Sequence, residues 1–167
     1  MSSALPPNPT TPRGSYEGHG TRRCGSRVVV YRCWMELSEG ARIRLDSDLV
    51  VWLTTITDAG APAPYPVWFI VDGDDVVVFS EPSARRVHNI ARRPLVSLHF
   101  NSDPFGGDVW VLTGRASTTP DVAPSSAPGY VDKYGESIER DLETTIDAVD
   151  ATYNTEIRIR PERVVTV

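Results

Sequence analysis

The pattern of apolar and polar residues in the middle of the chain predicts a run of short strands. Residues 49–57 are β-branched or aromatic almost throughout, which is typical of a strand buried on both faces. A turn containing Gly60 joins this strand to a second one over residues 63–71. Pro64 and Pro66 cannot donate ladder hydrogen bonds, so we expect the first half of the second strand at a sheet edge or a bulge.

The same pattern continues with a third strand, a helix and a fourth strand. The third strand covers residues 75–80 and follows an Asp-Gly-Asp turn. Pro82 favours an early helical position, which predicts a helix from there to about Arg93, where Pro94 ends it. Residues 95–101 then alternate as a half-buried strand does.

The last third of the chain predicts a long strand, two helices and a closing strand. We expect the long strand over residues 109–118, a helix over 127–135 and an amphipathic helix over 137–153. Residues 155–167 then close the chain as one bent strand or two, interrupted at Pro161. The apolar positions of the amphipathic helix are Ile138, Leu142, Ile146 and Val149. The whole pattern predicts a mainly β protein of six or seven antiparallel strands with flanking helices, arranged as a small barrel.

Composition supports one globular domain preceded by an extension of a different character. The chain has 167 residues, of which 40% are hydrophobic and 23% charged, as is usual for a globular protein. Residues 1–34 are rich in Pro, Gly and Arg, so we expect a disordered extension or a mis-assigned start there, with the domain over residues 35–167. No apolar run approaches the ~20 residues of a membrane span, and we expect no membrane role.

Charge and cysteine content exclude several classes of function. Residues 1–34 carry five arginines against Glu17, a net +4, so the remainder of a chain of net −5 carries −9. A body that acidic would be repelled by nucleic-acid backbones, and we expect no nucleic-acid partner. Cys24 and Cys33 both precede the domain, which excludes a disulfide framework or a zinc–thiolate site within it and fits a cytoplasmic protein. His88 and His99 lack a third ligand at metal-site spacing, so no metal is expected.

Candidate chemistry gathers at the predicted helix start after the third strand. Arg85 and Arg86 lie in the first turns of that helix, where free backbone N–H groups and the helix dipole favour an anion. This is a layout suited to binding phosphate. The alternative is a pair of solvated surface arginines, which is the usual situation of arginine on a helix.

An ordered series of motifs resembles the split β-barrel flavin and deazaflavin oxidoreductases of the pyridoxamine 5'-phosphate oxidase-like superfamily. Within it, residues 36–167 look most like the actinobacterial branch of coenzyme F420-dependent enzymes. The series consists of Thr54-Thr55-Ile56-Thr57-Asp58-Ala59-Gly60-x-Pro62, Pro66-Val67-Trp68-Phe69, Asp72-Gly73-Asp74, Ser80-x-Pro82-x-x-x-Arg86-x-x-Asn89-Ile90-x-x-x-Pro94-x-Val96 and Gly114-Arg115-Ala116.

The resemblance implies a homodimer with two cofactor sites at the subunit interface. It places these residues around the cofactor: Thr54, Thr55, Pro66, Val67, Trp68, Phe69, Ser80, Arg86 and Asn89. Arg85 is a further candidate at the helix start, and Trp110 is a candidate to reach the partner's pocket. Relatives commonly carry lysine at position 86, and arginine there keeps the charge and adds a bidentate fork. The resemblance supplies no side-chain acid or base, since the cofactor carries the hydride chemistry.

Three functions follow as hypotheses. The first is an oxidoreductase that passes hydride from reduced coenzyme F420 to a small electron-poor organic acceptor. Arg85, Arg92 and Arg93 favour it, because they could form a basic groove for the polyglutamate tail of that coenzyme. The second hypothesis keeps the fold and replaces the cofactor with FMN. The third is a binding protein without turnover that holds a cofactor or a tetrapyrrole.

Overall fold

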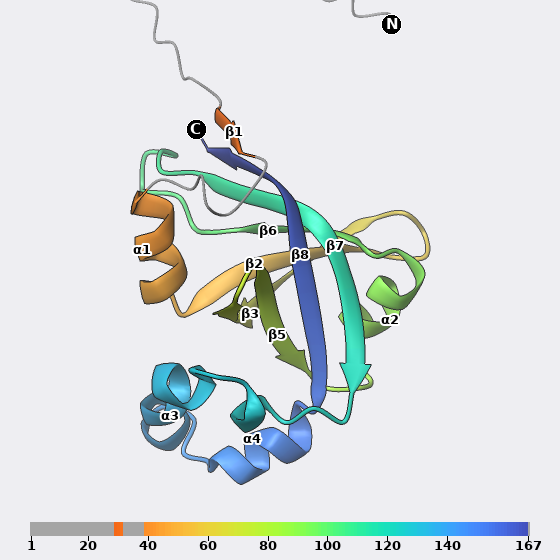
Figure 1. Cartoon of the computed structure of the whole chain (residues 1–167). Coiled ribbons are helices and arrows are strands. Elements are labelled where there is room, and N and C mark those ends of the chain that lie inside the picture. Colours follow the sequence, from red (N-terminus) through yellow and green to blue (C-terminus); the bar gives the residue numbers. More distant parts are fainter. Residues whose placement is uncertain (1–28, 32–38, 167) are drawn as a thin grey trace, which may run out of the picture.

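The computed structural model describes residues 29–31 and 39–166, which form one curled antiparallel sheet with helices at its ends (Figure 1). The strands are β1 (Val29–Tyr31), β2 (Val50–Ile56), β3 (Pro62–Trp68), β4 (Ile70–Asp72), β5 (Asp75–Ser80), β6 (Leu95–His99), β7 (Trp110–Pro120) and β8 (Thr155–Thr166). The helices are α1 (Glu39–Ser47), α2 (Arg85–Arg92), α3 (Tyr130–Arg140) and α4 (Ile146–Thr152), with a 3₁₀ turn η2 at Pro124–Ser126. None of these helices is long and apolar enough to cross a membrane.

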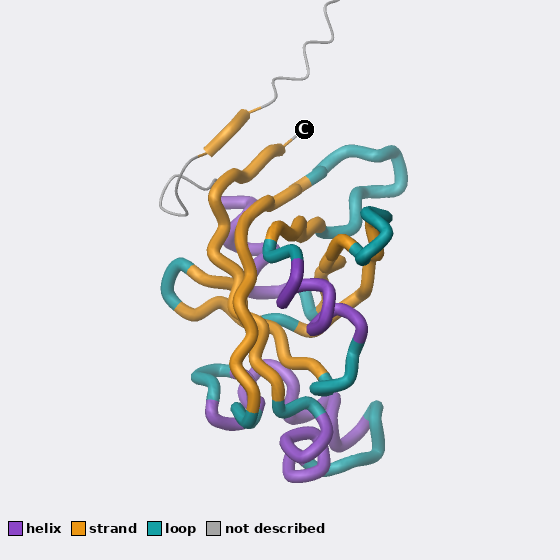
Figure 2. The backbone as a smooth tube through the Cα atoms, turned by 90° about the vertical axis from the view of Figure 1, so that its right-hand side faces the viewer, coloured by secondary structure: helices purple, strands orange, loops and turns teal. Residues whose placement is uncertain are grey.

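The sheet follows the order β3-β2-β6-β7-β8-β5-β4, and every pairing in it is antiparallel. The two longest strands, β7 and β8, run side by side along the sheet, and the shorter strands flank them (Figures 1 and 2). The expected fold class, a mainly β split barrel with flanking helices, is confirmed. β1 lies inside the segment expected to precede the domain and pairs with the end of β8. Cys24 and Cys33 lie outside the described residues, and the domain boundary stays a prediction.

The predicted single strand over residues 63–71 is wrong, because the chain breaks there into β3 and β4. These two strands lie at opposite ends of the sheet order, so the segment between them crosses the open side of the curl. The expected edge position of Pro64 and Pro66 is confirmed, since β3 pairs with β2 alone. The break falls at Phe69, whose backbone N–H donates to the Tyr134 hydroxyl at 2.9 Å. That hydroxyl is also 2.7 Å from the Phe69 carbonyl oxygen and 2.9 Å from the Leu49 carbonyl oxygen.

The predicted amphipathic helix over residues 137–153 is also wrong. α3 ends at Arg140, and α4 begins only after Thr145, whose side chain accepts a hydrogen bond from the Ala148 N–H at 3.3 Å. Glu143 between them has φ of 51°, a left-handed conformation that a continuous helix does not allow. The regular apolar spacing therefore spans two helices, and Leu142 between them is 54% exposed.

Smaller differences concern the ends and faces of other elements. The helix expected from Pro82 begins at Arg85, and no side chain caps its start. The helix expected from residue 127 begins at Tyr130. The strand expected to be buried on both faces, β2, alternates between buried and partly exposed positions, so only one face is covered.

Two apolar clusters meet at β5 and decide where a site can form. The first lies inside the curl of the sheet and includes Leu53, Leu98 and Val78. The second lies between the sheet and the helical pair α3–α4 and includes Val77 and Phe79. All six residues of β5 are buried, because alternate residues enter the two clusters. β5 therefore ends at the buried residue Ser80. The chain passes from this strand to α2 (Figure 1).

Replacing Tyr134 with phenylalanine is expected to destabilise the protein by about 2 kcal/mol. The substitution keeps the ring but leaves the buried Phe69 N–H without its hydrogen-bond acceptor. Urea denaturation followed by far-UV circular dichroism measures the effect. Ser126→Ala is the matched control, because it removes an exposed hydroxyl that bonds only the Ala123 carbonyl. Equal stability of the two variants would contradict the role given to Tyr134.

Candidate cofactor site

A cavity of about 290 Å³ opens between the sheet, α2 and the helical pair. The sheet and α2 contribute Pro66, Val67, Trp68, Phe79 and Arg86 to its lining. The other wall comes from α3, α4 and the residues that flank α4: Tyr130, Leu142, Val149 and Tyr153. The cavity is thus apolar and aromatic on most sides, with one cation at its edge.

That cation, Arg86, is held in place but is not neutralised. Its Nε donates to the Ser80 hydroxyl at 2.8 Å, and its guanidinium carbon lies 5.7 Å from the centre of the Tyr65 ring. The Ser80 side chain is fully buried, and its hydroxyl in turn donates to the Glu81 carbonyl at 3.2 Å. No acidic side chain pairs with Arg86 among residues 39–166. The two terminal nitrogens of a half-buried guanidinium are therefore left to bind an anion.

A buried hydrogen bond fixes α2 on the sheet behind Arg86. The Asn89 side-chain amide donates to the Thr55 hydroxyl at 2.9 Å, and both side chains are buried. Neither residue lines the cavity. Their position indicates a supporting role: they set the position of the helix that carries Arg86.

Trp68 forms the aromatic wall together with a tyrosine behind it. Its ring is stacked on Tyr134 with centroids 4.4 Å apart and an interplanar angle of 4°. Because Tyr134 is itself fixed at the β3–β4 break, the indole has little freedom to move. Phe69, in contrast, turns away into the inner cluster and lies edge-on to Phe100 at 5.7 Å.

The structure brings together only part of the residues predicted from sequence. Pro66, Val67, Trp68 and Arg86 line the cavity, with Ser80, Thr55 and Asn89 behind them. Four other candidates lie elsewhere: Thr54, Phe69, Arg85 and Trp110. Thr54 lines a separate hollow of about 370 Å³ on the outer face of the sheet, and Arg85 is exposed. Trp110 is buried at the start of β7, where its Nε1 donates to Asp108 at 2.8 Å.

Sequence reasoning missed five of the nine lining residues. Leu142 and Val149 were assigned to one helix face, and Phe79 was taken only as a strand residue. No pattern in the sequence points to Tyr130 or Tyr153, since only the packing of α3 and α4 against β5 brings them to the cavity.

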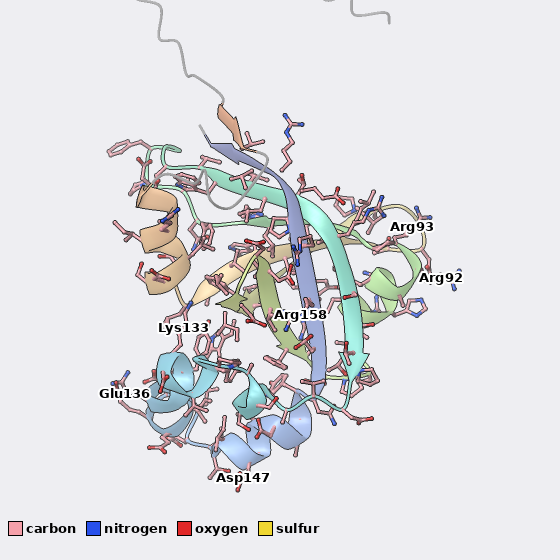
Figure 3. The ribbon with its side chains drawn as sticks, viewed as in Figure 1. Arg92, Arg93, Lys133, Glu136, Asp147 and Arg158 are labelled. Carbon is pink, nitrogen blue, oxygen red and sulfur yellow. The ribbon has the colours of Figure 1, made fainter. Side chains whose placement is uncertain are left out.

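A second basic region lies at the other end of α2 and contains an acid. Asp58, in the turn after β2, is 2.8 Å from Arg92 Nε and 3.1 Å from His88 Nε2. The hydrogen bond with His88 and the nearby arginines lower the pKa of the Asp58 carboxyl. Arg93 donates to the Asp58 backbone carbonyl at 3.3 Å. Arg92 and Arg93 lie side by side on the surface at this turn (Figure 3). The groove expected from these arginines is therefore partly neutralised.

No group of three or more His, Cys, Asp and Glu side chains in the described part of the chain could hold a metal ion. The site's chemistry is instead that of a flat apolar slot with a cation beside it. A curled antiparallel sheet with such a slot at the end of one strand defines a split-barrel protein.

Comparison with known families identifies the chain further. A model of the pyridoxamine 5'-phosphate oxidase family matches residues 37–167, and the chain belongs to that family. No curated protein matches the sequence significantly.

Solved structures share the fold. An F420 reductase superposes with a TM-score of 0.62 at 22% identity, covering 77% of this chain and 98% of that one. HutZ, the heme storage protein from Vibrio cholerae, gives 0.55 at 17% identity, covering 76% and 91%. General Stress Protein 26 from Bacillus anthracis gives 0.55 at 16% identity, covering 75% and 89%.

Proposed function

We propose that the chain is an oxidoreductase that binds reduced coenzyme F420 between two copies of itself and reduces a small electron-poor organic acceptor. Membership of the pyridoxamine 5'-phosphate oxidase family makes a flavin-type fold and cofactor the first expectation. The bound cofactor would supply the hydride, and the protein would bind it, orient it and exclude water.

The observation that carries this proposal is the unneutralised Arg86 beside an aromatic slot. A half-buried cation without an acid partner costs desolvation energy that an anionic ligand would recover. Ser80 occupies Nε and leaves the fork of the two terminal nitrogens free, which is the geometry that binds phosphate with two parallel hydrogen bonds. Coenzyme F420 and FMN both carry a phosphate and a flat ring system.

The opposite wall of the slot fits such a ring. Trp68 is held by its stack on Tyr134, and Val67 and Phe79 add rigid apolar surface from two strands. A ring placed there would be shielded from water and fixed against elements of the sheet, which is what hydride transfer requires.

The outer face of the sheet supports the proposed homodimer. Leu95 is 54% exposed on β6, and Val50 on β2 is also exposed. Trp52 and His99 on the same two strands stack with centroids 6.1 Å apart, and both remain partly exposed. This face also contains the hollow lined by Thr54 and Leu95. A second copy would cover apolar surface that is otherwise exposed to solvent.

Deazaflavin and FMN differ mainly in the anionic tail. Arg92 and Arg93 remain next to the helix that carries Arg86, but Asp58 offsets one of their charges. The tail groove therefore gives coenzyme F420 a smaller advantage than the arginines alone indicate. The non-catalytic alternative, storage of a cofactor or tetrapyrrole, is an outcome of the same experiment.

Titration of the full chain with coenzyme F420, FMN and haem tests the proposal. We expect coenzyme F420 to bind at micromolar concentration and its reduced form to be reoxidised when quinones or enones are added. Analytical ultracentrifugation of the same sample should give a dimer. Stronger binding of FMN than of coenzyme F420 would indicate an FMN-dependent oxidoreductase of the same fold. Tight haem binding, or cofactor binding without acceptor-dependent reoxidation, would favour the storage alternative.

A further inference from the structure

Tyr130 is a buried tyrosine whose ring is fixed at the wall of the cavity. It is the first residue of α3, follows Gly129 in a left-handed conformation, and is only 4% exposed. Its ring lies edge-on to Phe79 at 5.4 Å and at 5.1 Å from the Tyr134 ring. These contacts hold the ring in apolar packing, and the hydroxyl is the polar end of the side chain.

The Tyr130 hydroxyl makes no hydrogen bond within the described residues, unlike that of its neighbour Tyr134. Tyr134 contacts three backbone groups at 2.7 to 2.9 Å. The carboxylate whose charge acts on the Tyr130 phenol is that of Asp150. The Asp150 carboxylate is already used by Ser125, whose backbone N–H donates to it at 2.9 Å and whose hydroxyl also bonds it. The hydroxyl at the end of this buried side chain, without a partner among the described residues, is free to bond whatever fills the adjoining cavity.

The Tyr130 hydroxyl is protonated and can therefore donate a hydrogen bond. Burial, together with Asp150 and Tyr153, raises the pKa of Tyr130 to about 12, so the phenol keeps its proton at physiological pH. The complementary group on a ligand is therefore a hydrogen-bond acceptor such as a carbonyl oxygen.

The cavity holds one ring system, which identifies the ligand group that Tyr130 meets. Its volume of about 290 Å³ lies just below the ~300–1,000 Å³ of small-molecule sites. A ligand whose phosphate is bound by Arg86 would fill this space with its ring. Flavin and deazaflavin rings carry carbonyl oxygens on their pyrimidine edge.

We propose that the Tyr130 hydroxyl donates a hydrogen bond to a pyrimidine carbonyl of the bound ring and thereby favours its reduced form. This inference rests on the proposed cofactor function. A donor at that edge stabilises the reduced ring more than the oxidised ring, because reduction adds electron density there. Tyr130 forms no covalent bond and transfers no proton, so it is a positioning and tuning residue.

Tyr130→Phe in the full chain tests the proposal, with FMN and coenzyme F420 as probes. Affinity for the reduced cofactor should fall about tenfold more than affinity for the oxidised cofactor. For a two-electron couple this lowers the midpoint potential of the bound cofactor by about 30 mV, measured by spectroelectrochemical titration. The cofactor-free variant should melt no lower than wild type, because the hydroxyl it loses has no protein partner. Ser126→Ala is the control for loss of a hydroxyl outside the cavity.

Several results would overturn the proposal. Equal loss of affinity for both redox states would indicate packing alone, and no loss would exclude the hydrogen bond. The same potential shift in Tyr153→Phe, with none in Tyr130→Phe, would assign the donor to the other phenol of the cavity. A wild-type chain that binds neither cofactor would overturn the proposed function together with this inference. Cofactor binding that Tyr130→Phe leaves unaltered would overturn the inference alone.

Discussion

Replacing Gly114 with alanine is expected to destabilise the fold by about 4 kcal/mol or more. A Cβ at this position would clash with the Arg160 carbonyl oxygen and would lie 2.9 Å from both the Arg160 carbonyl carbon and the Pro161 Cα. All three atoms belong to the backbone of the neighbouring strand. They cannot rotate away as a side chain can, so β7 and β8 would have to separate at this point.

Gly114 lies where the register between the two longest strands changes. Thr113 pairs with Arg163, whereas Gly114 pairs with Pro161, so Glu162 is an extra residue on β8. Such a bulge bends the pair of strands and increases their twist. Because β7 and β8 are central to the sheet order, separating them would disrupt the curl that encloses the inner cluster.

The measurement is thermal and urea denaturation, with Gly135→Ala as the matched control. A Cβ at Gly135 would meet only the Val131 Cγ1 atom at 3.5 Å, an ordinary contact. Gly135 lies inside α3, where alanine is favoured over glycine by roughly 0.5–1 kcal/mol, so this variant should be as stable as wild type or more so. A Gly114→Ala protein that melts like wild type would show that the β-bulge relaxes freely, contrary to this prediction.

The elements predicted well from sequence are those whose signals are local. The turn at Gly60, the strand over residues 75–80 and the strand over 155–167 follow from turn residues and alternation within a few positions. The break at Phe69 could not be found this way. The apolar run over residues 67–71 continues through it without a polar or turn residue, and its backbone groups are satisfied by Tyr134, which is 65 residues further along the chain.

In the candidate site, too, only the part that depends on local signals could be predicted. Its basic part could be predicted, since Ser80 and Arg86 lie in one strand–helix connection whose spacing is visible in the sequence. Its helical wall could not, because Tyr130 and Tyr153 are brought together only by the packing of α3 and α4 on β5. Which of Thr54 and Thr55 faces the inside of the curl could not be predicted for a related reason. Alternation along β2 places Thr55 inward and Thr54 on the outer face, and no local signal says which face bears the site.

Replacing Arg86 with glutamine is expected to weaken binding of FMN and coenzyme F420 by about 100-fold or more, about 2.7 kcal/mol. Glutamine can still reach toward Ser80 but brings no charge for a phosphate. Arg86→Lys keeps the charge and loses both the fork and the planar contact with Tyr65, so a smaller loss of about tenfold is expected. Isothermal titration calorimetry or cofactor fluorescence measures both variants.

Riboflavin provides the decisive control, because it has the ring of FMN without the phosphate. If Arg86 binds the phosphate, Arg86→Gln should leave the affinity for riboflavin nearly unaltered, while the affinity for FMN falls by about 100-fold or more. Arg85→Gln removes an exposed arginine from the same turn of α2. It should weaken cofactor binding no more than about twofold, as expected of a screened surface charge. An equal loss for riboflavin and FMN in Arg86→Gln would place the guanidinium against the ring. The phosphate would then have to lie near another cation, and the exposed Arg85 would be the first to test.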